Sequence, residues 1–191
     1  EGLRYELRRR PGQLTLLDEL VAAYERLGTP QPALDYLRQQ APSAPVLQML
    51  AGLAKRAGDL DLALASWQRL FQDPAQLTPE LAMRAAVLAL LKGQAAQGLA
   101  WLEAAQAKLP PGSPDGPDFW RLTAQIAQGQ QRDALAVQAY RQLLQSETPE
   151  LGDFDALIRL LQTDLPLQAA EVALRAWQEH DQPRHLLLAL N

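Results

Sequence analysis

Histidine and cysteine, the residue types that most often bind metals or carry out acid–base chemistry, are scarce in this sequence. It contains two histidines, His180 and His185, in the stretch EHDQPRH, and no cysteine. Two histidines that bind one metal from the same helix lie about three or four positions apart. These two are further apart and Pro183 lies between them. We therefore predict no metal site here, and we expect both histidines to be exposed at a junction between helices.

Nucleophilic catalysis and phosphate binding have little support either. A nucleophilic serine needs a base beside it, and the serines lie far from either histidine in the repeat pattern described below. They are Ser43, Ser66, Ser113 and Ser146. The stretch GSPDG at 112–116 is typical of turns, but we find neither the lysine nor the following helix of a phosphate-binding loop. Asp59 and Asp61 flank a helix start, where acids cap a helix. We predict a non-catalytic protein without a cofactor or a metal.

The composition indicates a mostly helical protein with an ordinary mixed-charge surface. Leu, Ala, Gln and Arg dominate the 191 residues, aromatic residues make up 6%, and β-branched residues are few. The net charge is −4 with both signs interspersed, which argues against nucleic acid as a partner. No apolar run approaches the roughly 20 residues of a membrane span, so we expect no direct insertion of this segment into a membrane. The chain opens inside a helical pattern without Met, and we expect it to be a piece of a longer protein.

A pattern of large and small residues suggests pairs of packed helices. In the stretch DFWRLTAQIAQGQQRDALAVQAYRQLL (118–144), Trp120 and Ala124 lie one helical turn apart, and so do Ala136 and Tyr140. A small residue facing a large one lets two antiparallel helices approach closely. The break at 129–131, Gly-Gln-Gln, is short enough to connect them as a helical hairpin.

This pattern recurs along the chain with a period of about 34 residues, which is the signature of a helical solenoid. The repeats are expected at 14–43, 44–78, 79–116, 117–150 and 151–184, with partial helices at 1–10 and 185–191. Their signature residues include the turn glycines Gly28, Gly58 and Gly93, the small residues Ala86 and Gly98 of the third repeat, and, in the last full repeat, Phe154, Ile158, Ala170 and Leu174. We interpret the long break at 109–119 as an enlarged turn.

The four tryptophans divide into two groups by their place in the pattern. Trp67 and Trp120 occupy large positions of the repeat, so we expect them in the core. Trp101 and Trp177 fall outside that register. We expect these two at the surface, where an exposed tryptophan can anchor a partner.

The repeat resembles the tetratricopeptide repeat family, and the resemblance covers essentially the whole chain. The best copy is Trp120, Ala124, Gly129, Ala136, Tyr140 and Pro149, and the next is Leu17, Leu20, Tyr24, Gly28, Ala33 and Pro45. The second repeat is short, the third lacks the aromatic residues, and Leu165 stands where the fifth should have its turn glycine. The resemblance implies an all-α fold, a right-handed superhelical solenoid of antiparallel helix pairs, forming a single array over 1–191.

The same resemblance implies a concave groove, lined by the first helix of each pair, that binds another protein. The groove positions are Asp18, Glu25, Arg26, Gln48, Lys55, Arg56, Met83, Val87, Arg121, Gln125 and Gln128. Some family members clamp the carboxylates of chaperone tails with Lys, Asn and Arg. Here the clamp positions of the first repeat hold Asp18 and Ala22, which disfavours that role.

The Gln-, Ala-, Leu- and Arg-rich, lysine-poor style also resembles the periplasmic repeat regions of bacterial outer-membrane exopolysaccharide exporters, the Pel-type export porins. That resemblance implies a periplasmic scaffold that holds a polysaccharide deacetylase or hydrolase near the export pore during biofilm matrix secretion. A generic adaptor, or a spacer that self-associates through its repeat ends, remains an alternative, in the envelope or the cytoplasm. Direct contact with a glycan also stays open.

Overall fold

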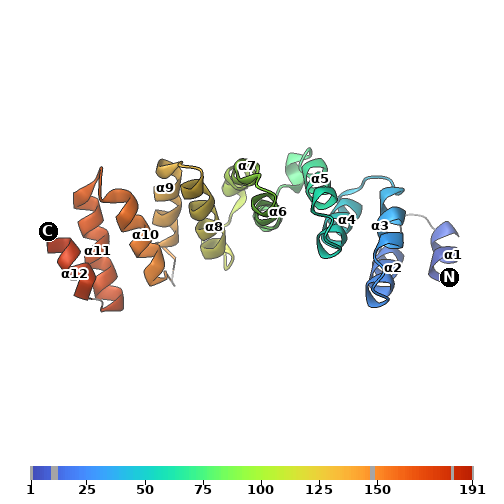
Figure 1. The fold of residues 1–191 in the computed structure, drawn as a ribbon, viewed down its shortest axis with the longest axis horizontal. Helices are drawn as coiled ribbons and strands as arrows, with labels where there is room; N and C mark the ends of the chain where they lie inside the picture. The colour runs from blue at the N-terminus through green and yellow to red at the C-terminus, as the bar shows by residue number, and fades with distance from the viewer. Residues whose placement is uncertain (1, 10–12, 147–148, 182, 191) are drawn as a thin grey trace. The chain divides into compact units, whose positions relative to one another are not determined.

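The computed structural model describes residues 2–9, 13–146, 149–181 and 183–190. The secondary structure elements in these ranges are all helices, joined by turns and loops, and none is a β-strand (Figure 1). Consecutive helices pack against each other as pairs. The prediction of an all-α fold built from helix pairs is therefore confirmed.

The first of two compact units spans residues 1–77. Its helices are α1 (Gly2–Arg9), α2 (Leu14–Arg26), α3 (Gln31–Arg38), α4 (Ala44–Arg56) and α5 (Leu60–Leu70), followed by the short 3-10 helix η1 (Pro74–Gln76). Helix α2 packs against α3, and α4 packs against α5. Contacts of α4 with both α2 and α3 join the two pairs.

The second unit spans residues 78–191. Its helices are α6 (Pro79–Leu91), α7 (Ala95–Ala105), α8 (Gly116–Gly129), α9 (Asp133–Leu143), α10 (Leu151–Leu161), α11 (Pro166–His180) and α12 (Pro183–Leu190), with the 3-10 helix η2 (Gln106–Lys108) after α7. The pairs are α6 with α7, α8 with α9, and α10 with α11, and α12 packs on α11 (Figure 1). The break predicted at 109–119 lies inside this unit, but the loop itself covers only 109–115, because α8 begins at Gly116.

Capping and turn residues fix where the helices begin and end. The Thr78 hydroxyl accepts a hydrogen bond from the Leu81 N–H at 3.3 Å, and the Asp59 carboxylate accepts one from the Leu62 N–H at 3.0 Å. Gly28 and Gly58 take the positive φ angles of 67° and 82° that close the turns after α2 and α4.

The turn after α8 departs from the prediction. Gly129 is the last residue of α8, and the left-handed position is taken by Gln131, with φ of 57°. The hairpin is formed as expected, but the residue that closes it is not the glycine. A side chain other than glycine in this region carries a steric cost of about 1–2 kcal/mol.

Small residues let the paired helices approach closely. Ala124 and Ala136 are fully buried and Tyr140 is nearly so, as the pattern predicts. At Gly98 of α7, an added Cβ would lie 3.1 Å from both the Cα and the carbonyl oxygen of Ala86 on α6. The backbones of α6 and α7 therefore approach each other closely at Gly98.

The last full repeat departs from its predicted register in the second helix. Phe154 and Ile158 of α10 are buried as expected, but Leu174 of α11 is exposed and Ala170 is half-buried. The buried residues of α11 are Ala169, Ala173 and Ala176. Leu165, which precedes α11, does not take the left-handed conformation of the turn glycines. The turn therefore differs from the glycine-closed hairpins, and the buried positions of α11 are shifted by one residue.

The tryptophans follow the prediction only in part. Trp67 is buried as expected, and Trp120 is half-buried against the core. Trp101 was expected at the surface, but it is buried, because α7 packs on one side against α6 and on the other against α8. Trp177 is half-buried rather than exposed. Neither is therefore a freely exposed anchor.

Candidate protein-binding site

The predicted groove residues all lie on the first helices of the pairs. In the first unit they are Asp18, Glu25 and Arg26 on α2, and Gln48, Lys55 and Arg56 on α4; in the second unit they are Met83 and Val87 on α6, and Arg121, Gln125 and Gln128 on α8. Helix α2 contacts α4, and α6 contacts α8. The structure thus brings each set together on neighbouring helices within its own unit, and their role in binding stays a prediction.

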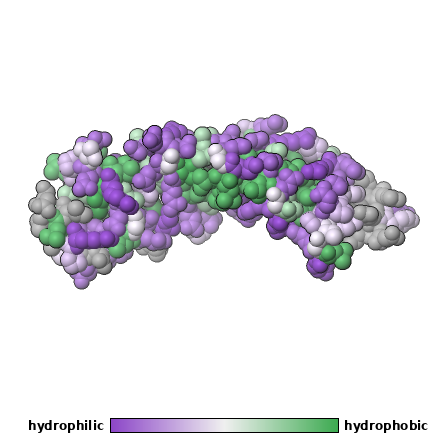
Figure 2. All heavy atoms as spheres, viewed as in Figure 1, coloured by the Kyte–Doolittle hydropathy of each residue, from purple (hydrophilic) through white to green (hydrophobic). Residues whose placement is uncertain are grey.

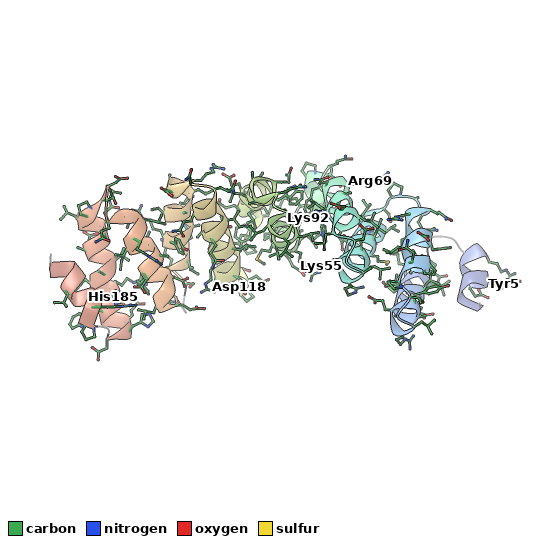
Figure 3. The ribbon with its side chains drawn as sticks, in the orientation of Figure 1. Tyr5, Lys55, Arg69, Lys92, Asp118 and His185 are labelled. Atoms are coloured by element: carbon green, nitrogen blue, oxygen red, sulfur yellow. The ribbon has the colours of Figure 1, made fainter. Side chains whose placement is uncertain are left out.

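In the first unit, two of the predicted residues pair with each other. The Glu25 carboxylate accepts a hydrogen bond from the Arg56 guanidinium, and both residues line a hollow of about 220 Å³ at the ends of α2 and α4. Arg26 donates to the carbonyl of Ala22 at 3.3 Å. Lys55 is exposed on α4 (Figure 3). An exposed pair such as Glu25–Arg56 stabilises a protein by at most about 1 kcal/mol, so a charged partner can compete for it.

In the second unit, α6 presents exposed apolar side chains. Val87, Leu90 and Leu91 are 38%, 47% and 66% exposed, and Met83 is half-buried one turn before Val87. Figure 2 shows hydrophobic residues gathered over this helix. We call Val87, Leu90 and Leu91 the α6 apolar face.

Polar amides lie on the neighbouring helix. Gln125 and Gln128 are exposed on α8, which contacts α6. An apolar patch bordered by polar groups is a common composition of protein-binding surfaces.

Arg121, the remaining predicted residue of α8, is held in an ion network with α10. Its guanidinium donates to both oxygens of Asp153, at 3.1 and 3.0 Å. It also lies 3.1 Å from the Glu150 carboxylate and 3.3 Å from that of Asp118, which extends from the start of α8 (Figure 3). The hydrogen bonds to Asp153 raise the pKa of Arg121, so the guanidinium stays charged.

Asp153 was not among the predicted residues. It is 5% exposed, and besides binding Arg121 it accepts a hydrogen bond from the Glu150 N–H at 2.9 Å, which closes a capping box at the start of α10. Two signals in the sequence point to it: the acid lies three residues after Glu150 at a helix start, and it lies 32 residues after Arg121, close to one repeat. Arg121 therefore links α8 to α10 as well as facing solvent.

The histidines differ from the prediction that both are exposed. His185 on α12 is fully buried, with its Nε2 2.6 Å from the Asp155 carboxylate on α10 (Figure 3). His180 is half-buried, with its ring 5.5 Å from that of Phe154. Both rings lie among these helices, in which α11 packs against both α10 and α12. The His185–Asp155 pair therefore joins α12 to α10.

The described residues also give no support to a metal site, a phosphate-binding loop or a membrane-spanning helix. Within the described residues, no cluster of three or more His, Asp or Glu side chains is placed to hold a metal ion. The stretch 112–116 does precede a helix, α8, contrary to the prediction, but it has no lysine. None of the helices in the described ranges is both long and apolar enough to span a membrane.

Comparison with known proteins identifies the repeat. The family model described as tetratricopeptide repeat matches residues 70–191. No curated protein matches the chain. Among solved structures, MamA (residues 41 to the end) from Desulfovibrio magneticus RS-1 is 19% identical with a TM-score of 0.61, covering 90% of this chain and 97% of that one.

Two further structures have the same fold. Pseudomonas aeruginosa pilF is 17% identical with a TM-score of 0.58, covering 96% of this chain and 83% of that one. YrrB, described as a TPR protein with an unusual peptide-binding site, is 10% identical with a TM-score of 0.66, covering 100% of this chain and 96% of that one. At these identities the likeness establishes the fold alone.

Proposed function

Because this chain belongs to the tetratricopeptide repeat family, we propose that it is a non-catalytic scaffold that binds a partner protein through the α6 apolar face and the amides of α8. The observation that carries this proposal is the exposure of Val87, Leu90 and Leu91 on one helix. Isolated apolar residues on a surface are ordinary, but adjacent ones bordered by polar groups favour an interaction site.

The partner that fits this surface has an apolar anchor flanked by polar groups. Burying a leucine side chain fully contributes about 1.5–3 kcal/mol, and Leu90 and Leu91 still have about half or more of their surface to bury. Gln125 and Gln128 can each donate and accept hydrogen bonds at the rim of such a contact.

The test is capture of the partner by the full chain and by two matched variants. Leu90→Lys places a charge in the α6 apolar face, whereas Leu167→Lys makes the same change on α11 at a side chain that is 82% exposed. Bait immobilised from each variant is incubated with a cell-envelope extract, and the captured proteins are measured by quantitative mass spectrometry. We expect a specific partner to bind the wild type and Leu167→Lys equally and Leu90→Lys at least about tenfold less, since a charge buried without a pair opposes binding. Equal capture by all three baits would show that the α6 apolar face is not the interface.

We propose further that the scaffold acts in the periplasm and recruits a polysaccharide deacetylase or hydrolase to an exopolysaccharide export pore. The support for this narrower role is compositional: the chain has no cysteine and is rich in Gln, Ala, Leu and Arg. Recovery of such an enzyme in the capture experiment would support the role, and recovery of cytosolic proteins alone would contradict it. Self-association through the repeat ends is a separate expectation, which the mass in solution at several protein concentrations tests.

A further inference from the structure

A second hollow lies in the second unit, apart from the α6 apolar face. Its volume is about 740 Å³, within the range of about 300–1,000 Å³ that is usual for ligand sites. One wall is formed by the loop residues 109–114 with Gly116 and Pro117 at the start of α8. The other is formed by Trp120 of α8 and the residues Gln142, Gln145 and Ser146 at and after the end of α9. It shares no lining residue with the α6 apolar face.

Among the residues that the structure describes, none that lines this hollow carries a charged side chain. The residues that line it are leucine, proline, glycine, serine, tryptophan and glutamine. A charged ligand would lose hydration on entering without gaining an ion pair, and the cost of that loss is large. The lining therefore selects a neutral ligand.

Trp120 gives the hollow a fixed aromatic surface. Its ring contacts the buried Phe119 ring edge-on, with centroids 5.3 Å apart, and it packs against the core of the second unit. The opposite wall supplies the rings of Pro110, Pro111, Pro114 and Pro117. A rigid aromatic side chain facing rigid rings binds a ligand with little loss of conformational entropy.

The polar groups of the hollow can all donate hydrogen bonds. Gln142 and Gln145 have exposed amides, and Trp120 has its indole N–H. The hydroxyl oxygen of Ser146 is buried and has no hydrogen-bond partner among the described residues. Because protein atoms cover this oxygen, the donors that a ligand in the hollow can reach are those of Gln142, Gln145 and Trp120.

We propose that this hollow binds a proline-rich segment of a partner protein in the polyproline II conformation. Such a segment is neutral, makes no internal hydrogen bonds, and presents carbonyl acceptors to the donors of Gln142, Gln145 and Trp120. Its rings pack on aromatic surfaces, as proline-rich segments do in other recognition domains. A neutral sugar fits less well, because its hydroxyl groups would lie against the proline rings of the loop wall without partners. The hollow is a second contact, and it does not depend on the α6 apolar face.

The experiment is a titration of the isotope-labelled 191-residue chain with a ten-residue polyproline peptide, followed by the indole N–H signals in NMR spectra. Trp120→Phe identifies the Trp120 signal by its loss and keeps an aromatic ring in place. We expect a saturable shift of this signal in the wild type. In Gln142→Ala/Gln145→Ala the affinity should fall by about tenfold or more, the effect of losing two hydrogen bonds.

Gln138→Ala is the matched control. Gln138 is exposed on α9 one turn before Gln142 and does not line the hollow, so its replacement should leave the affinity unchanged. No saturable shift at millimolar peptide, or equal affinity in the double variant and Gln138→Ala, would overturn the proposal. So would a Trp120 shift caused by maltopentaose and not by the peptide, which would identify a sugar as the ligand. Leu90→Lys should bind the peptide normally, so failure of this proposal and failure of the α6 interface are distinguishable.

Discussion

Replacing Asp153 by asparagine is the sharpest test of how consecutive repeats of the second unit are held together. The substitution keeps the size of the side chain and one acceptor oxygen but removes the charge that binds Arg121 at two oxygens. The Asp153 side chain is 7% exposed and that of Arg121 is 22% exposed. The carboxylate is therefore buried from solvent, whereas water reaches part of the guanidinium.

The expected loss follows from that geometry. Removing one partner of a buried ion pair costs about 3–5 kcal/mol. Asparagine preserves one hydrogen bond, and Arg121 keeps its contacts with the exposed Glu150 and Asp118, so we expect about 2 kcal/mol. For a chain of this length that corresponds to a fall of about 4–8 °C in Tm.

The assay is unfolding in urea followed by circular dichroism, together with hydrogen exchange of the α10 amides. Glu103→Gln is the matched control, because Glu103 and Arg132 also join consecutive repeats but have side chains 32% and 52% exposed. That change should cost less than about 1 kcal/mol. If Asp153→Asn is as stable as the wild type, or if Glu103→Gln costs as much as Asp153→Asn, then burial does not set the strength of these pairs and the reasoning is wrong.

Three further predictions concern packing, turn geometry and pH. Gly98→Ala should destabilise the protein by about 1 kcal/mol or more in urea unfolding, because the Cβ of the new alanine would lie 3.1 Å from the Ala86 backbone. Gly152→Ala is the control, because the new Cβ has open space around it, and this change should be neutral or stabilising. Gln131→Gly should raise the stability by about 1 kcal/mol in the same assay, since Gln131 has a φ of 57°, where a side chain has a steric cost that glycine lacks. An unchanged urea midpoint would contradict this steric cost. Burial raises the pKa of Tyr140 above its ordinary value of about 10. The unfolded chain then loses that proton first, so stability should fall as the pH rises past about 10, and Tyr140→Phe should make the fall shallower in pH-dependent thermal melts.

The helix pairs could be predicted from the sequence because their packing depends on local patterns of residues. A small residue opposite a large one, as with Ala124 and Tyr140, is repeated at a fixed spacing, and a glycine with positive φ closes most hairpins. Where the local signal changes, the prediction fails in a definite way. Gln131 closes a turn that a glycine was expected to close, and α11 enters one residue out of register after Leu165.

The burial of particular side chains was harder to predict because it depends on the neighbouring repeat. Trp101 lies outside the core register of its own hairpin, but α8 of the next pair covers it. His185 is covered in the same way by the packing of α12 onto the preceding helices. The hollow beside Trp120 forms where the loop before α8 lies near the end of α9, which no spacing in the sequence specifies.

Charged side chains of this protein repeatedly pair across one repeat, and this changes how its binding surface should be sought. Glu25 binds Arg56 31 residues later, Arg132 binds Glu103 29 residues earlier, and Arg121 binds Asp153 at a separation of 32. In an array of repeats, stability comes from each repeat and its contacts with the next. Charge reversal at such a residue therefore alters the stability of the array as well as any contact with a partner. Uncharged exposed groups such as Leu90 report on binding with less of this interference.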